Sequence, residues 1–497
     1  MSFSVVEFYG QNSRYACGYC KQSNSCYSNG MWAHRLTCQD YQELIDRGWR
    51  RSGCYCYKPV MDVTCCPSYT IKCDALNFSL NKSHKKILKR LHKFLRDGKR
   101  DPTDTTGALG TSEEDSTEDN ESFEHMEVPS MEPHPVDQDV MDVMELGEAN
   151  PKHDRPSEHT VESESGGSNV PKHAASAIEN FPKHSTESNI TNQPKKAKLM
   201  RIERKREKLQ KKGLSDAEIE NMMKSSKGSS SSKSPKKTLE EFLAECPQES
   251  DKPAHRLKIV TLPTAGAKFK ESLHDSYALY RKYQTAIHND PPGAIEEYLD
   301  FLVKSPLKGA QGYGSFHQQY WLDDRLIAVG VIDVLPNCVS SVYFFYDPEF
   351  KFLSLGTYSS LREIAYTRSL HSKYPNIKSY YMGFYIHSCP KMRYKSNLQP
   401  SYLLCPETYT WHPLDKTVLA KLDAHKYSRL NDDAEAQDAN HTTEQDVKET
   451  LVLTGRSYTT YAEYLTMVDA DEDVPSMAEY ARLVGKSCAK KMMLYKI

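Results

Sequence analysis

The densest run of apolar residues lies between residues 314 and 411, where extended segments follow one another with short polar breaks. Two of these segments, 317–322 and 325–335, flank the polar pair Asp323-Asp324. Extended apolar runs on either side of a two-residue polar turn predict a β-hairpin. The sequence therefore has its best-formed core in this stretch, and we place the chemistry there.

The same stretch continues with a strand, a helix and another strand. A third apolar run, 339–346, is followed by a segment starting at Gly356 whose apolar Leu361 and Ile364 fall at helical spacing. A further strand is predicted over 379–386. The order β-β-β-α-β predicts an α+β fold, with a mixed sheet and a helix on one face.

Three more helices are predicted outside this core. Residues 275–288 place tyrosines on one face and end before two prolines, and residues 458–468 form a short amphipathic pattern. Residues 83–97 combine apolar positions at helical spacing with many lysines and arginines. Such a face is commonly a solvated one, but its dense positive charge favours contact with a nucleic-acid backbone.

A second segment mixes aromatic and basic residues. Residues 47–53 place Trp49 among Arg47, Arg50 and Arg51. This mixture suits stacking on unpaired bases together with neutralisation of phosphate. Packing of Trp49 in a small core is the alternative.

Composition divides the chain of 497 residues. Net charge is −2, mean hydropathy is −0.69, and aromatic residues almost vanish between 100 and 237, which predicts a disordered segment. The predicted parts are a cysteine-rich domain at 1–98, a disordered linker at 99–237, a second domain at 238–425, and a polar insert with a helical tail at 426–497.

Nine of the 14 cysteines precede residue 74. Cys17 and Cys20 form a Cys-x-x-Cys knuckle, which suits two thiolates on one metal ion. Cys65 and Cys66 could complete a four-sulfur set, although neighbouring side chains of an extended strand diverge. Burial as small hydrophobic residues is the alternative. The chain start shows no secretory leader, and no run approaches the roughly 20 apolar residues that span a bilayer, so we expect a cytoplasmic or nuclear protein with no membrane partner.

Several long segments carry a family pattern, namely His317-Gln318, 332–343, 354–356, 387–395 and 405–409. They closely resemble the arginyl-tRNA–protein transferases, which move arginine from charged tRNA to proteins beginning with Asp, Glu or oxidised Cys. The resemblance covers roughly 1–98 and 240–430. It implies a GNAT-like acyltransferase fold at 238–425, zinc or an iron–sulfur cluster at the four cysteines, and marking of acceptors for ubiquitin-dependent N-degron degradation.

Candidate site residues follow from this chemistry. Aminolysis of an aminoacyl ester needs a neutral amine, a positioned carbonyl and a stabilised oxyanion. An acidic acceptor residue needs a cation. The arginyl donor needs a carboxylate, for which Asp333 is the first candidate and Glu363 the second. The predicted catalytic residues are His317, Gln318, Tyr320 and Asp333, and the predicted substrate-binding residues are Arg281, Lys391, Arg393, Tyr394 and Lys395.

The spacing of the last group carries a geometric expectation. If residues 391–395 are extended, Lys391, Arg393 and Lys395 point to one face. The carboxylate expected for the donor is Asp333, at a strand end.

Two other functions are weighed. A coenzyme A-dependent N-acyltransferase needs a pyrophosphate-binding loop that the strand–helix junction at 352–357 lacks, so we expect no coenzyme A. A zinc-dependent RNA-binding adaptor without catalysis explains the cysteines and the basic helix. It leaves the polar residues His317, Gln318 and Asp333 without a role.

Overall fold

The computed structural model describes residues 3–12, 14–100, 133–136, a few residues between 206 and 220, 237–309, 312–468 and 474–496. Contacts divide the chain into two units, one formed by Met1–Asn150 with Lys237–Ile497 and one by Pro151–Lys236. The linker predicted at 99–237 lies almost entirely outside the described residues, so its disorder stays a prediction.

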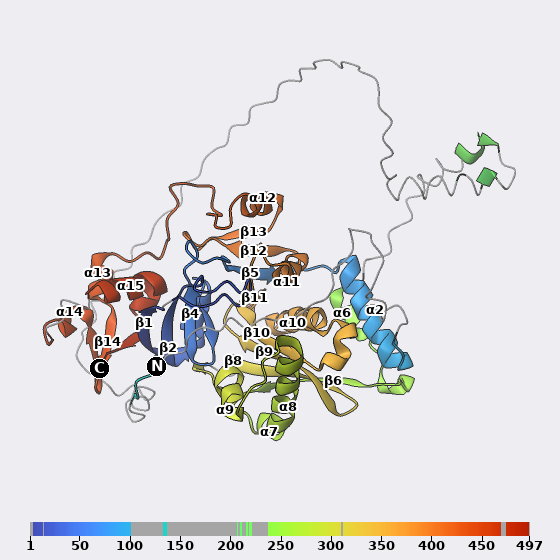
Figure 1. Ribbon diagram of the computed structural model, residues 1–497, viewed down its shortest axis with the longest axis horizontal. Helices are drawn as coiled ribbons and strands as arrows, with labels where there is room; N and C mark the ends of the chain where they lie inside the picture. The colour runs from blue at the N-terminus through green and yellow to red at the C-terminus, as the bar shows by residue number, and fades with distance from the viewer. Residues whose placement is uncertain are drawn as a thin grey trace, which may run out of the picture. The chain divides into compact units, whose positions relative to one another are not determined.

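The densest apolar run supplies most strands of an eight-stranded mixed sheet, the central sheet, which β5 and β6 from elsewhere in the chain complete (Figure 1). Its strands follow in the spatial order β13 (Trp411–Pro413), β12 (Ser401–Leu404), β5 (Tyr69–Asp74), β11 (Ser379–Tyr385), β10 (Cys338–Tyr346), β9 (Arg325–Val334), β8 (Gly314–Leu322) and β6 (Leu257–Pro263). β10 and β11 run parallel, whereas the other neighbouring pairs of this sheet are antiparallel.

The predicted hairpin is confirmed as β8 and β9. The strands pair up to Leu322↔Arg325, and Asp323 and Asp324 form the turn with φ angles of 48° and 68°. Two successive positive φ angles are typical of the tight turn whose twist matches that of the flanking strands. The Asp323 carboxylate also accepts a hydrogen bond from the Arg256 amide at 2.7 Å, which ties the turn to the start of β6.

Two predicted helices pack on this sheet. The helix expected from Gly356 is α10 (Leu355–His371), and the helix expected over 275–288 is α8 (Leu273–Tyr283) continued by a π-helical turn, η3 (Gln284–His288). The predicted order β-β-β-α-β is therefore confirmed.

α8 and α10 cover opposite faces of the central sheet, because alternate residues of a strand point to opposite sides. Phe345 of β10 packs on Tyr280 of α8, with 5.6 Å between ring centroids. Its neighbour Phe344 packs on Tyr320 at 6.3 Å, and Tyr320 contacts Tyr358 of α10 at 6.2 Å. The sequence predicted one covering helix, and the structure shows a second on the other face.

A second eight-stranded sheet, the terminal sheet, combines strands from the two ends of the chain (Figure 1). Its order is β15 (Ser457–Thr460), β14 (Leu451–Thr454), β16 (Met493–Tyr495), β1 (Val5–Gln11), β2 (Ser28–Thr37), β4 (Tyr55–Pro59) and β3 (Arg50–Ser52), with β7 (Leu307–Lys308) pairing with β2 off this path. Residues on either side of the predicted domain boundaries near 98 and 425 thus share sheets.

The other described helical segments are α1 (Cys38–Ile45), α2 (Lys82–Asp97), α6 (Leu239–Ala244), η2 (Glu249–Asp251), α7 (Ala267–Glu271), α9 (Ile295–Tyr298), η4 (Leu299–Val303), η5 (Pro348–Leu353), α11 (Pro390–Arg393), η6 (Tyr394–Asn397), α12 (Lys416–Ala424), α13 (Glu444–Lys448), α14 (Tyr461–Tyr464), α15 (Val474–Val484) and α16 (Lys486–Ala489). α2 confirms the predicted basic helix. The helix predicted at 458–468 is wrong at its start, because Tyr458, Thr459 and Thr460 pair with β14 as strand residues.

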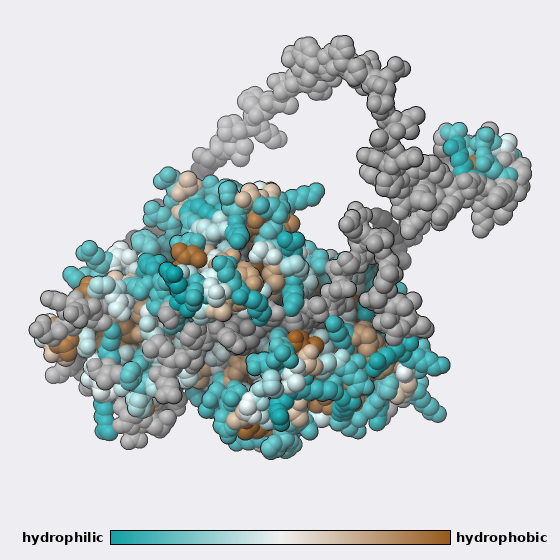
Figure 2. Space-filling view, viewed as in Figure 1, coloured by the Kyte–Doolittle hydropathy of each residue, from teal (hydrophilic) through white to brown (hydrophobic). Residues whose placement is uncertain are grey.

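Most of the buried apolar residues in the described part of the chain belong to two clusters, each packed mainly against one of the two sheets. Figure 2 shows hydrophilic residues prevailing over the visible face, with hydrophobic residues in small, separate patches. No helix among the described residues is long and apolar enough to cross a membrane.

Candidate active site

A pocket opens where β10 and β11 diverge. The two strands pair in parallel from Cys338↔Ser379 to Ser340↔Tyr381, and beyond this point β10 continues along β9 while β11 continues along β5. The space between them holds a pocket with about 100 Å³ of free volume. Its lining comes from β10, β11, the segment 390–397 and the single residues Phe301 of η4 and Ser360 of α10. Residues near the start of the chain complete it, namely Tyr19, Tyr41, Arg50, Arg51, Ser52 and Tyr57.

Two of the buried cations that line this pocket, Arg50 and Lys395, are held by a bulge in β11. A bulge in β11 between Tyr381 and Phe384 places Gly383 at a φ of 66°, a conformation that glycine adopts without steric cost. Arg50 Nη2 donates to the Gly383 carbonyl oxygen at 3.3 Å. Lys395 Nζ donates to the Phe384 carbonyl oxygen at 2.7 Å. The bulge therefore holds both cations through successive backbone carbonyls.

Burial lowers the pKa of both cations. Arg50 is 6% exposed and donates to the carbonyls of Ile45 at 3.2 Å and Trp49 at 2.6 Å, while its Nε has no hydrogen-bond partner among the described residues. Burial lowers the pKa of Arg50. Burial, and then the neighbouring Arg50, lowers the pKa of Lys395 to about 7. Positive charge of this kind in a small pocket favours an anionic ligand.

An ion pair beside the pocket joins the two sheets. Arg51 of β3 donates from Nε to Asp333 Oδ2 at 2.8 Å and from Nη2 to Asp333 Oδ1 at 2.5 Å. The Ser315 hydroxyl donates to the same carboxylate at 2.7 Å. The two charged side chains are 2% and 0% exposed. Asp333, predicted to receive the guanidinium of a donor, is thus paired with an arginine of its own chain.

This ion pair lies between two hollows. Arg51 lines the pocket, and Ser315 lines a larger groove of about 1260 Å³. The groove also carries the basic residues Arg35, Lys304 and Lys308.

The other predicted catalytic residues lie in the core of the central sheet. His317 is fully buried, its Nε2 donates to the Leu302 carbonyl at 2.9 Å, and burial lowers its pKa to about 4. On the opposite face of β8, the Tyr320 hydroxyl donates to Gln318 Oε1 at 2.5 Å. None of the three lines the pocket or the groove, so the structure does not bring them together with Asp333 at a surface.

The expectation that residues 391–395 are extended is wrong. This segment forms α11 and the start of η6, and a proline at the first helical position presets the backbone for the turn. Lys391 and Arg393 are therefore exposed, whereas Lys395 is 3% exposed and lines the pocket.

Of the remaining predicted substrate-binding residues, one lines the pocket and one does not. Tyr394 lines the pocket beside Lys395. Arg281 is exposed on α8, with its guanidinium 5.8 Å from the centre of the Tyr277 ring, and does not line the pocket.

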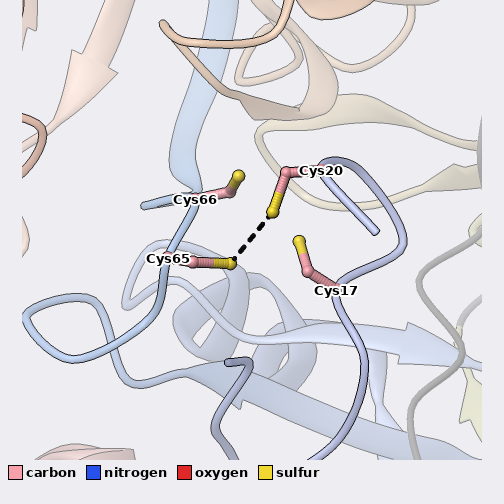
Figure 3. A group of neighbouring side chains, drawn as sticks. All are labelled: Cys17, Cys20, Cys65 and Cys66. Carbon is pink, nitrogen blue, oxygen red and sulfur yellow. Dashed lines mark hydrogen bonds between the residues drawn. The ribbon is translucent and has the colours of Figure 1, made fainter. Parts of the chain in front are cut away.

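The four predicted metal-binding cysteines converge. The sulfur atoms of Cys17, Cys20, Cys65 and Cys66 all lie within 4.8 Å of one another, and Figure 3 shows them gathered between two loops. The backbone bends at Cys65 and Cys66, so these neighbours do not diverge as they would in a strand. Hydrogen bonds from Cys26 and Cys66 lower the pKa of the Cys17 thiol. Four sulfur donors at this spacing could hold one metal ion.

The cysteine cluster lies against the pocket. Tyr19, between Cys17 and Cys20, lines the pocket. Cys17 also belongs to a buried cluster with Phe384 and Met392, which line the pocket too. The cluster therefore supports one side of the pocket.

Sequence reasoning missed Arg50 and Arg51 as pocket residues. The sequence suggests either contact of this segment with nucleic acid or packing of Trp49 in a core, and the second is confirmed for Trp49, which is fully buried and donates from Nε1 to the Leu483 carbonyl at 3.2 Å. In the sequence, the feature that could have indicated them is the pair of adjacent arginines directly after Trp49.

Two regions of the chain match models of one known protein family. The family models described as "Arginine-tRNA-protein transferase, N terminus" and "Arginine-tRNA-protein transferase, C terminus" match residues 15–86 and 275–405. Arginyl-tRNA–protein transferase 1 of Drosophila melanogaster is 46% identical over 514 residues, covering 100% of both chains. This chain belongs to the arginyl-tRNA–protein transferase family.

Two further relatives extend the comparison. Arginyl-tRNA–protein transferase 2 of Arabidopsis thaliana is 34% identical over 86% of this chain and 78% of its own. An aspartate/glutamate leucyltransferase of Stutzerimonas stutzeri is 38% identical over 27% of this chain and 53% of its own.

The chain is thus an aminoacyltransferase that uses arginyl-tRNA. The residues that line its pocket all fall within the two matched ranges, 15–86 and 275–405. The pocket is thus formed by the parts of the chain that carry the family pattern.

Proposed function

We propose that this enzyme moves arginine from arginyl-tRNA to the α-amine of proteins that begin with Asp, Glu or oxidised Cys. Arginylation of these proteins marks them for ubiquitin-dependent degradation through the N-degron pathway, in the cytoplasm or nucleus. The observation that carries the acceptor specificity is the pair of buried cations, Arg50 and Lys395, in the pocket.

An acidic acceptor residue fits the electrostatics of this pocket. A carboxylate would bring negative charge to Arg50 and Lys395, whereas an amide of the same shape would bring none. A site built for a charged group discriminates strongly against a neutral isostere of the same shape. The sulfinic and sulfonic acids of oxidised cysteine carry the same negative charge. The name of the Stutzerimonas stutzeri relative, which specifies aspartate and glutamate, supports the same acceptor class.

The acceptor stem of the donor tRNA is proposed to lie along the groove on the other side of the Arg51–Asp333 pair, with its terminal arginyl ester extending into the pocket that Tyr380 lines. The groove lined by Arg35, Lys304 and Lys308 offers positive charge to the acceptor end of a tRNA. The exposed lysines and arginines of α2 offer further contacts to its phosphate backbone.

We also propose a GNAT-like arrangement of the central sheet and zinc or an iron–sulfur cluster at the four cysteines. The divergence of two central parallel strands supports the first, since it opens the interior of the sheet to a substrate. The convergence of four sulfur donors supports the second. Coenzyme A is not part of the proposal, because the ester of arginyl-tRNA supplies the activated carbonyl.

Incubation with radiolabelled arginyl-tRNA tests the proposal. Matched peptides beginning with Asp, Glu, Gln and Ala are supplied to the purified full-length chain. We expect label in the Asp and Glu peptides at rates well above those of the other two. Equal labelling of all four peptides would exclude the proposed specificity, and label in none would exclude the proposed transfer to a peptide α-amine.

A further inference from the structure

A buried carboxylate that the proposed binding of substrates does not use lies behind the pocket. Glu363 of α10 is 1% exposed, and no ion pair to it is found among the described residues. Its oxygens accept hydrogen bonds from the Ser359 hydroxyl at 2.6 Å and from the Tyr380 hydroxyl at 2.7 Å. A buried carboxylate without a cation is costly, so its retention here calls for a chemical reason.

The partners of this carboxylate connect it to the pocket. Tyr380 lines the pocket, and its hydroxyl donates to Glu363. Ser341 and Ser360 line the pocket as well, Ser341 hydrogen-bonds Glu363, and the Tyr380 hydroxyl lies 3.5 Å from Ser360 Oγ. The hydroxyl-bearing residues Tyr380 and Ser341 therefore connect Glu363 to the lining of the pocket.

The opposing strand leaves room for the carboxylate. A Cβ added at Gly330 in the middle of β9 would lie 3.0 Å from Glu363 Oε1 and 3.5 Å from Ser359 Oγ. Glycine in a strand interior weakens the strand, so it is expected where a close approach requires it. The chain thus has a residue of minimal size where the carboxylate meets the sheet.

Resting on the arginyl transfer proposed above, we propose that Glu363 accepts, through the Tyr380 hydroxyl, the proton that the acceptor α-amine loses during attack. Tyr380 is the residue that touches the substrate, and Glu363 acts through it. The amine nitrogen forms a bond to the arginyl carbonyl carbon. Its proton passes to the Tyr380 oxygen while the Tyr380 proton passes to Glu363.

The cycle closes when the ester bond breaks. The bond between the arginyl carbonyl carbon and the terminal tRNA oxygen is cleaved, and Glu363 returns its proton through Tyr380 to that oxygen. The products are an amide and a free hydroxyl, and Glu363 is again a carboxylate. No oxidant, reductant or further reactant is needed.

The surroundings suit a proton acceptor. Burial raises the pKa of Glu363, while hydrogen bonds from Ser359, Tyr380 and Ser341 oppose the shift. A raised carboxyl pKa lies closer to neutral pH, where a general base is most effective. The titratable groups facing the carboxylate or the Tyr380 hydroxyl are Tyr320 of β8, Tyr380 of β11 and Tyr394 of η6.

The test measures single-turnover arginylation of an Asp-starting peptide at several pH values in four full-length variants. These are Glu363→Gln, Tyr380→Phe, the double variant, and the control Tyr358→Phe, whose hydroxyl accepts from Arg362 instead. We expect each single change to slow turnover by about 100-fold or more, and the double variant to be no slower than either. The peptide KM and the control rate should stay near the parent values.

The pH profile separates this role from a structural one. The parent enzyme should lose rate on the acid side through two ionisations, whereas Glu363→Gln should retain only that of the peptide amine, near pH 8. If Glu363→Gln does not fold, Tyr380→Phe, which removes a single oxygen, decides the question. Near-parental rates and an unchanged profile in the folded variants would overturn the relay. If the parent enzyme labels Asp and Ala peptides equally well, the proposed function is overturned instead.

Discussion

At the scale of single residues, the roles expected from the sequence differ most from the structure where burial decides what a side chain can contact. Lys391 and Lys395 look alike in the sequence, but one helical turn places the first in solvent and the second in the pocket. Asp333 likewise looks like an available carboxylate but is paired with Arg51. Sequence reasoning identified the segment that supplies the cation, but it could not select the lysine, because which lysine is buried depends on packing against β11.

The pH dependence of acceptor choice should follow Lys395. Its pKa is lowered to about 7, so the attractive ammonium form prevails below that pH and is lost as pH rises through it. The ratio of kcat/KM for an Asp peptide to that for an Asn peptide should therefore fall as pH rises, because both peptides share the same amine ionisation. In Lys395→Arg the cation persists throughout this range, and the ratio should stay flat. A parent ratio that does not change with pH would exclude this lysine as the titrating group.

The Arg51–Asp333 pair should matter for stability. Asp333→Ala removes one partner and leaves a fully buried guanidinium, which we expect to lower the unfolding free energy by about 3–5 kcal/mol in urea titrations. The exposed pair Arg96–Asp97 offers a control, and Asp97→Ala should leave the unfolding curve almost unchanged. Similar unfolding curves for the two variants would mean that the buried ion pair does not stabilise the fold by this amount.

At the scale of elements, the local sequence pattern predicts individual strands and helices but does not predict which strands pair. The hairpin, β10, α10 and β11 follow from apolar periodicity and turn residues, which are properties of neighbouring positions. The placement of β5 beside β11 joins residues about 300 positions apart, and nothing in either strand specifies that partner. The bulge at Gly383 depends on this same pairing, so the cation site could not be predicted either.

Disruption of the cluster formed by Cys17, Cys20, Cys65 and Cys66 should weaken binding of the acceptor peptide more than binding of arginyl-tRNA. On the metal proposal above, Cys65→Ser and Cys66→Ser should each lower the metal content of the purified enzyme, because one ion needs all four sulfurs. Tyr19 and its neighbours would then lose support, and the peptide KM should rise more than the arginyl-tRNA KM. Cys246→Ser, outside the cluster, should leave metal content and both constants unchanged. Full metal content in Cys65→Ser and Cys66→Ser would remove these residues from the coordination set.

At the scale of the whole molecule, the two ends of the chain complete each other's sheets. Strands from residues 451–495 extend the terminal sheet, and β5 lies within the central sheet. The pocket needs this interleaving, since Arg50 and Lys395 come from segments more than 300 residues apart. A long segment between the two matched regions is therefore compatible with a single site.

The most direct test of the central claim compares two lysines only four residues apart. For the parent enzyme, Lys395→Met and Lys391→Met, kcat/KM is measured with arginyl-tRNA and matched peptides beginning with Asp or Asn. We predict that Lys395→Met narrows the Asp-over-Asn preference by about 30-fold or more, equivalent to about 2 kcal/mol, while Lys391→Met preserves it. A preserved preference in Lys395→Met, or a lost one in Lys391→Met, would contradict the assignment of the pocket to the acidic acceptor.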